Sequence, residues 1–236
     1  MNSISRILLV MAMHDEAESI IEALKLKPQK SDHPKLPVEI FSGTYCKKKV
    51  WLQLNGKCPN YNVHSIGTEA SVLNTFIGIE NFAPDLILNA GTAGGFASLN
   101  ANIGDIYLSH PYVSHHDRRI NIPGFKEYGI GKYPCYPCEH IAKKMGVKLG
   151  VISTGNSLDH TPTDLEILKS HNGAVKEMEA AAIAWIASIY GIPFLAIKAI
   201  TDIVDGANPT EEEFLKNLAY SSKKLGEKTI ELIKEL

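Results

Sequence analysis

Residues 198–206 (KAITDIVDG) place a hydroxyl and a carboxylate, Thr201 and Asp202, after an apolar run that predicts a strand. Ligands of open α/β sheets bind at the carboxyl ends of the strands. A carboxyl group that is partly desolvated there has a raised pKa, so it can hold and deliver a proton near neutral pH. Asp202 is therefore a candidate general acid, although an aspartate after a strand also serves as a helix N-cap or turn residue.

A second carboxylate follows the first predicted strand, in residues 12–17 (AMHDEA). Glu16 would lie at the start of a helix, where the amide dipoles stabilise a negative charge. Such a position suits a group that accepts a proton. The alternative is that Asp15 and Glu16 are ordinary residues of a helix N-terminus.

Residues 89–96 (NAGTAGGF) form a glycine-rich segment after another predicted strand. Glycines let the backbone approach a ligand closely and present its amide donors. The segment does not fit the GxGxxG pattern of dinucleotide sites, because neither a long helix nor an acid follows at the required spacing. We expect a tight turn that lines a ligand.

Residues 175–182 (VKEMEAAA) offer groups that suit a sugar. A carboxylate accepts hydrogen bonds from two vicinal hydroxyls, so Glu179 is a candidate ribose ligand. Met178 offers a polarisable apolar surface for a sugar face. The alternative is that Met178 fills the core while Glu177 and Glu179 face solvent.

The elements that must position these residues alternate along the chain. Continuous apolar runs separated by amphipathic patterns indicate a largely parallel sheet covered on both faces. No Pro/Gly/Ser-rich linker divides the chain, so residues 1–236 are predicted to form a single domain. The predicted strands are 7–13, 50–54, 86–90, 106–113, 148–153 and 194–200, and the predicted helices are 15–26, 69–81, 163–171, 180–190 and 210 onward.

The composition indicates a small-molecule partner. The formal net charge is −2 and the longest run of basic residues is 47–49, so the sequence predicts binding neither to nucleic acid nor to an anionic membrane. No stretch approaches the ~20 apolar residues of a membrane span. The first residues lack the pattern of a signal peptide, and we expect a cytoplasmic protein.

The four cysteines, Cys46, Cys58, Cys135 and Cys138, are expected to be thiols. Cys135 and Cys138 have the CxxC spacing of redox motifs and half-zinc sites. A tetrahedral zinc site needs two further ligands, and no second cysteine pair has this spacing. We therefore predict neither a metal nor another cofactor.

Taken together, the motifs resemble a known family. AMHDEA, NAGTAGGF, STGNSLD, KEMEAAA and KAITDIVDG occur in the order and approximate spacing of 5'-methylthioadenosine/S-adenosylhomocysteine nucleosidases, which belong to the nucleoside phosphorylase superfamily. TDIVDG, STGNSLD, HHDRRI and IPGFKEYGIG are most similar to the plant-type branch. The resemblance implies a single three-layer α/β/α domain with a mixed, mostly parallel sheet, a homodimer, and a place in methionine salvage.

The resemblance also implies an activity, hydrolysis of the N-glycosidic bond between adenine and a 5'-thioribose. Asp202 matches the acid that protonates adenine N7, and Glu16 matches the residue that activates the attacking water. We expect burial to raise the pKa of Asp202 while Glu16 stays ionised near water. The implied substrate-binding residues are Thr92, Gly94, Leu158, Asp159, Met178, Glu179, Thr201 and Ile66, and the segment that would close the 5'-thio pocket of a partner subunit includes His115, His116 and Asp117.

The sequence departs from the family pattern at two positions and leaves three competing functions open. Asn156 stands where this branch is expected to have aspartate, and Leu158 where bacterial enzymes often have an aromatic ring. A purine nucleoside phosphorylase would need cationic anchors for phosphate, whereas the N-terminal loop carries two acids. The second competing function is another nucleosidase, such as a futalosine hydrolase, and the third is a catalytically silent binding or storage protein of the same fold.

Overall fold

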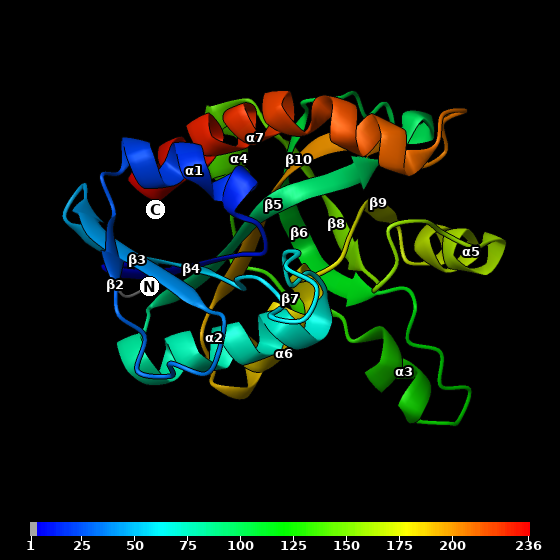
Figure 1. Cartoon of the computed structure of the whole chain (residues 1–236). Helices are drawn as coiled ribbons and strands as arrows, with labels where there is room; N and C mark the ends of the chain where they lie inside the picture. The colour runs from blue at the N-terminus through cyan, green and yellow to red at the C-terminus, as the bar shows by residue number, and fades with distance from the viewer. Residues whose placement is uncertain (1–3) are drawn as a thin grey trace.

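The computed structural model describes residues 4–236, in which ten strands form one mixed sheet with helices on both faces (Figure 1). Residues 1–3 of the predicted domain 1–236 lie outside the described residues. The strands are β1 (Arg6–Met11), β2 (Lys27–Gln29), β3 (Glu39–Tyr45), β4 (Lys48–Leu54), β5 (Leu86–Gly95), β6 (Ile106–His115), β7 (Tyr133–Pro134), β8 (Lys148–Thr154), β9 (Gly173–Glu177) and β10 (Phe194–Ile203). The helices are α1 (His14–Ala23), α2 (Thr68–Phe82), α3 (Phe125–Ile130), α4 (Glu139–Met145), α5 (Pro162–Ser170), α6 (Ala180–Ile189) and α7 (Thr210–Glu235).

Strand β5 is the centre of the sheet. Its first half lies parallel to β1, and most of its length lies parallel to β10. Its last two residues, Gly94 and Gly95, also pair antiparallel with β9. Because β10 pairs with β6, β6 with β8 and β8 with β9, these strands close a ring that begins and ends at β5. The carboxyl ends of β5, β9 and β10 therefore meet.

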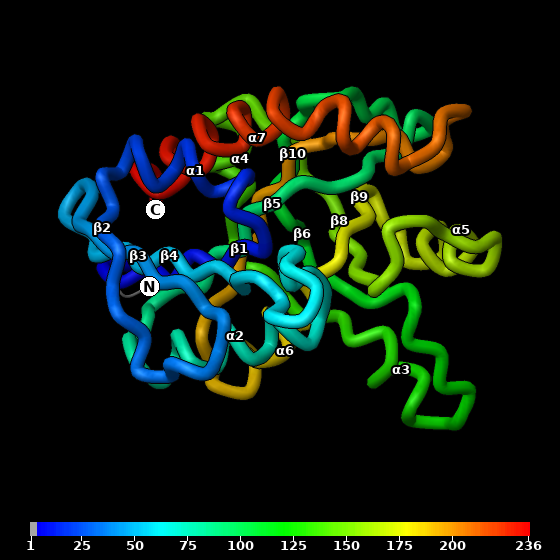
Figure 2. Tube along the Cα trace, viewed as in Figure 1, coloured from blue at the N-terminus to red at the C-terminus, as the bar shows by residue number. Residues whose placement is uncertain are grey.

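Two layers of helices enclose the sheet. Helices α1, α4 and α7 cover one face, and α2 and α6 cover the other (Figure 1). Helices α3 and α5 lie beyond β6, β8 and β9, at one end of the molecule (Figure 2). Helices α1 and α7 each bury an apolar stripe, whereas α6 is apolar and buried on nearly all sides. None of the helices in the described part of the chain has the length and apolar character needed to cross a bilayer.

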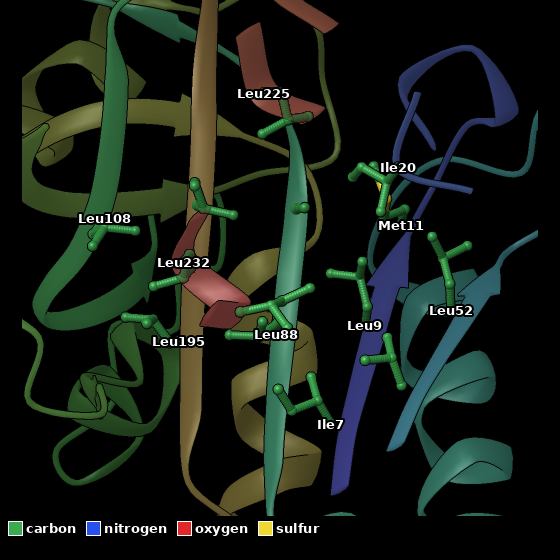
Figure 3. Close-up of a cluster of buried hydrophobic side chains, with 14 of the residues drawn as sticks. Ile7, Leu9, Met11, Ile20, Leu52, Leu88, Leu108, Leu195, Leu225 and Leu232 are labelled. Carbon is green, nitrogen blue, oxygen red and sulfur yellow. The ribbon is translucent and has the colours of Figure 1, made fainter. Parts of the chain in front are cut away.

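The larger core cluster fills the space between the sheet and the α1 and α7 layer (Figure 3). Aliphatic side chains from the strands meet others from both helices, and all are nearly inaccessible to solvent. Close packing of this kind stabilises by about 25 cal/mol per Å² of apolar surface removed from water. The labelled members are Ile7, Leu9, Met11, Ile20, Leu52, Leu88, Leu108, Leu195, Leu225 and Leu232.

The α/β class and the mixed sheet are as the sequence predicts, but two strands extend furthest beyond their predicted ends. Strand β5 continues to Gly95, so the glycine-rich segment is the end of a strand and not a tight turn. Strand β10 continues to Ile203, with an irregularity between Ile200 and Asp202. β5 continues because β9 and β10 both pair with its last residues, and β10 continues because it pairs with β5 as far as Ile203. The apolar pattern alone does not predict β3, β9 or the short β2 and β7.

Candidate active site

One cavity lies where the carboxyl ends of β5, β9 and β10 meet. The first turn of α1 and the segment before α2 form other parts of its wall. Four carboxylates and one ammonium group line it, and most of the remaining wall is apolar. Its lining residues are Ala12, Met13, Glu16, Ile66, Thr92, Ala93, Gly94, Leu158, Lys176, Glu177, Met178, Glu179, Thr201, Asp202 and Phe214.

Glu16 lies in the first turn of α1 and points at β5. The backbone N–H and the hydroxyl of Thr92 both donate to Glu16 Oε1, at 2.7 and 2.6 Å. The carboxylate is buried from the outer surface but lines the cavity, and the expectation that Glu16 is ionised beside water stays a prediction. Burial raises the pKa of Glu16, and the two Thr92 hydrogen bonds and the charge of Lys198 oppose that rise. The rise in pKa from burial is the larger effect, while the Thr92 hydrogen bonds and the charge of Lys198 each favour the ionised form.

Asp202 faces the same cavity from β10. The Thr201 hydroxyl lies 2.8 Å from Asp202 Oδ1 and 3.2 Å from the Ala93 carbonyl oxygen. A Cβ built on Gly94 would lie only 2.6 Å from Asp202 Oδ2, so a glycine at that position leaves room for the carboxyl group. Burial raises the pKa of Asp202, as expected for a group that must carry a proton at neutral pH.

Glu179 is the third carboxylate, at the start of α6. The Gly67 N–H donates to Glu179 Oε1 at 2.9 Å, and this bond ties the carboxylate to the segment before α2. Burial, followed by the charge of Glu177, raises the pKa of Glu179. Met178 lies beside it in the cavity wall. The structure therefore brings the two predicted sugar-binding residues into one cavity with Glu16 and Asp202.

Lys198 and Glu177 form a buried ion pair at the cavity wall, which Glu177 lines. Lys198 Nζ lies 2.7 Å from Glu177 Oε2, and both side chains are 1% exposed. Burial opposes both charges, but each charge stabilises the other, which raises the pKa of Lys198 and lowers that of Glu177. Glu177 also accepts hydrogen bonds from Thr154 and from the Ala180 N–H. This pair fixes the start of α6, and with it Glu179.

Lys198→Met should destabilise the protein by about 3–5 kcal/mol, because it leaves the Glu177 carboxylate buried without its partner. Urea unfolding measures this loss. The matched control is Arg6→Met, which removes the partly exposed pair with Asp85 and should cost less than about 1 kcal/mol. Adding Glu177→Gln to Lys198→Met should recover part of the loss. If Lys198→Met costs no more than the control, the pair does not support this side of the cavity.

The segment after β8 brings Leu158 to the cavity, where its backbone is held by Lys176. Lys176 Nζ donates to the carbonyl oxygens of Ser157 and Leu158 at 2.6 and 2.9 Å. Asp159 does not line the cavity. Asn156 stands where the family pattern is expected to have aspartate. Its Oδ1 accepts a hydrogen bond from the Thr68 N–H at 2.9 Å, which ties this segment to α2.

The three residues predicted to serve a partner subunit lie outside this cavity. His115 lines a second cavity with Arg118 and residues of α2 and α6. His116 Nδ1 lies 3.1 Å from Ser153 Oγ, and Asp117 accepts from the Asn156 N–H at 2.7 Å. Burial lowers the pKa of His115 and His116 to about 4, which favours the neutral imidazole. Their predicted role at the partner's pocket stays a prediction.

The two thiols of the CxxC segment lie away from the cavity. Cys138 is buried, and its Sγ lies 3.8 Å from the Ser109 carbonyl oxygen. Burial raises the pKa of Cys135 to about 11 and that of Cys138 to about 12, which disfavours the reactive thiolate. Within residues 4–236 there is no group of three or more His, Cys, Asp or Glu side chains that could hold a metal ion.

Sequence reasoning missed three charged residues of the site: Lys176, Glu177 as an ion-pair partner, and Lys198. All three lie in strands buried on both faces, where a charged side chain needs a partner. A lysine within the otherwise apolar run 194–200 was the available signal, since such a lysine predicts a buried acid nearby. The identity of that acid depends on β9, which the sequence pattern does not predict.

Comparisons with known proteins agree with this geometry. Residues 6–234 match the model of the phosphorylase superfamily. A 5'-methylthioadenosine/S-adenosylhomocysteine nucleosidase of Arabidopsis thaliana is 40% identical over 98% of this chain and 91% of its own length. A 5'-methylthioadenosine nucleosidase of the same plant is 38% identical over 91% of this chain and 81% of its own. The crystal structure of an MTA/SAH nucleosidase, 38% identical, superposes with a TM-score of 0.96 and covers 99% of this chain and 96% of that one. The chain therefore belongs to the phosphorylase superfamily and, within it, to the family of 5'-methylthioadenosine/S-adenosylhomocysteine nucleosidases.

Proposed function

We propose that this protein is an N-ribosyl hydrolase that cleaves 5'-methylthioadenosine to adenine and a 5-thioribose, with S-adenosylhomocysteine as a second substrate. The observation that carries the proposal is the pairing of two unlike carboxylates in one cavity. Thr92 directs two donors at Glu16, whereas Asp202 is buried beside a single hydroxyl. Such a difference in environment allows one carboxyl group to act as the general acid and the other as the general base.

In the proposed reaction, Asp202 gives its proton to N7 of adenine as the bond between N9 and C1' breaks. Adenine then leaves as a neutral base, and its loss creates an oxocarbenium-like ribose that nearby carboxylates stabilise. The attacking water gives its hydroxyl group to C1' and its proton to Glu16. Glu16 must be ionised for this step, and Thr92 and Lys198 favour that form.

The remaining lining residues support binding in this proposal. Glu179 accepts hydrogen bonds from the ribose hydroxyls, and Met178 packs against the sugar. Backbone groups near Leu158 bind adenine, Thr92 and Gly94 form the floor near the sugar, and Thr201 orients the acid. Ile66 lies toward the 5'-thio group. The same proposal includes a homodimer in which His115, His116 and Asp117 close the partner's pocket, a cytoplasmic location and a place in methionine salvage.

The charge of the cavity favours water over phosphate as the nucleophile. Its lining has four carboxylates, and its single cation, Lys176, already donates to two carbonyl oxygens. A phosphorylase needs cationic side chains free to bind phosphate. The retention of Glu16, Glu179 and Asp202 in one cavity also argues against a silent binding protein.

Varying phosphate tests this proposal. Adenine release from 5'-methylthioadenosine should run at the same rate without phosphate and at about 50 mM phosphate, because among the described residues that line the cavity no cationic side chain is free to bind the anion. No sugar phosphate should form. Chromatography of the products with 5'-methylthioadenosine and S-adenosylhomocysteine in parallel gives the substrate preference. A rate that is proportional to phosphate, with sugar 1-phosphate as a product, would make the protein a phosphorylase instead.

A further inference from the structure

Lys176, Gly94 and Asp202 occupy one row across three neighbouring strands. Gly94 of β5 pairs with Lys176 of β9 on one side and with Asp202 of β10 on the other. Residues that pair directly across strands project their side chains from the same face of a sheet. Gly94 places no side chain between its two neighbours. The lysine and the aspartate therefore lie on one side of the sheet, and both line the active-site cavity.

The hydrogen bonds of Lys176 leave its charge uncompensated by direct contact. Its side chain is buried, at 5% exposure, and both acceptors of its ammonium group are neutral carbonyls, those of Ser157 and Leu158. Burying an ammonium group costs free energy, so a lysine at this place needs favourable interactions that offset this cost. Two carbonyls satisfy its donors, and the positive charge itself acts on the acids around it.

We propose that Lys176 is a positioning residue of the reaction: it holds the loop that binds adenine, and it places a positive charge beside Asp202 so that Asp202 releases its proton more readily. The inference rests on the proposed function, because it takes Asp202 as the proton donor. Lys176 itself transfers no proton.

The charges around Lys176 and Asp202 support this proposal, in which Asp202 transfers the proton and Lys176 acts on it through its charge. Burial and the charge of Glu213 on α7 raise the pKa of Asp202, whereas the Thr201 hydrogen bond and then the charge of Lys176 oppose that rise. The cation on β9 therefore partly offsets the rise and makes Asp202 a stronger acid than burial alone would leave it. The charged and titratable groups that act on Lys176 are Asp202, Asp159, Asp164 and Glu177, and Lys176 in turn acts on His116.

The test compares Lys176→Met with Lys176→Arg, using kcat and KM for 5'-methylthioadenosine from acid to alkaline pH. Asp202 must be protonated to act, so kcat/KM falls as pH rises through its pKa in the free enzyme. Removing the cation raises that pKa, and the basic limb of Lys176→Met should move upward by about one pH unit. Its KM should rise by about tenfold, because the loop loses two hydrogen bonds from a charged donor. Lys176→Arg keeps the charge and should keep the basic limb of the wild type.

Lys228→Met is the matched control, since Lys228 also donates to a backbone carbonyl, that of Met145, but lies outside the cavity. Its KM and basic limb should equal those of the wild type. If Lys176→Met does not fold, as judged by thermal melting, Lys176→Gln removes the charge and keeps hydrogen-bond donors, and it should show the same shift of the limb.

An active, charge-free variant with the basic limb and KM of the wild type would overturn the inference and leave the proposed function intact. An arginine variant whose limb shifts as far as that of the methionine variant would also overturn it, because the charge would then not be the cause. By contrast, a wild-type protein that releases no adenine would contradict the proposed function itself. An Asp202→Asn variant with full activity would remove the premise that Asp202 is the proton donor.

Discussion

Asp202→Asn is expected to slow adenine release from 5'-methylthioadenosine by about three orders of magnitude. The amide has the size of the carboxyl group and fits beside Gly94, where space is limited. It cannot donate an equivalent proton to N7, so adenine would have to leave as an anion. Single-turnover measurement of adenine at saturating substrate isolates this chemical step, and binding of substrate should change little.

Asp205→Asn is the control for this variant. Asp205 lies three residues further along and accepts hydrogen bonds from the Ala97 and Ser98 N–H groups, but it does not line the cavity. Its rate should stay within about threefold of the wild type, since surface substitutions shift free energies by less than about 0.5 kcal/mol. Near-normal turnover of Asp202→Asn would remove Asp202 as the general acid.

Glu16→Gln should also lower the rate of hydrolysis, by about two to three orders of magnitude, because the amide cannot accept the proton of the attacking water. The variant should still bind a transition-state analogue, since the amide oxygen can accept the two hydrogen bonds that Thr92 donates to Glu16. Calorimetry with the analogue and a steady-state assay separate binding from turnover.

Asp15→Asn provides the comparison for Glu16→Gln. Asp15 is the neighbouring acid of the same helix turn, and its side chain is 65% exposed. Asp15→Asn should change neither turnover nor binding of the transition-state analogue. If Glu16→Gln turns over like Asp15→Asn, Glu16 is not the base, and another group must activate the water.

Much of this cavity could be predicted from the sequence, because its residues follow apolar runs that must be strands. Glu16, Thr92, Met178, Glu179 and Asp202 lie in one cavity, as their positions in the predicted elements suggest. Parallel strands bring their carboxyl ends to one edge, so residues far apart in the chain become neighbours there. The positions of the motifs after the predicted strands were thus enough to predict that these residues share one cavity.

The surroundings of these residues could not be predicted in the same way. β9 is short and includes Lys176 and Glu177, so it shows no apolar run, and only its pairing with β5 and β8 reveals it. The burial of Glu16 depends on the approach of α1 to the end of β5, where Thr92 lies 76 positions further along the chain. The bond from the Gly67 N–H to Glu179 joins residues 112 positions apart.

The partners of the buried charged residues could likewise be predicted only in part. A lysine in a buried strand signals a buried acid, but Lys198 could in principle pair with any of several carboxylates. The structure pairs it with Glu177, and that pairing leaves Glu16 and Glu179 free to face the cavity. Which carboxylates remain available for chemistry is therefore decided by the fold.

The stoichiometry of products from 5'-methylthioadenosine in phosphate-free buffer decides most directly whether the wild-type protein is a hydrolase. We expect one adenine and one free 5-methylthioribose for each nucleoside consumed, with no phosphorylated sugar. If the folded protein releases no adenine, or releases it only after phosphate is added, the protein is not a nucleosidase for this substrate.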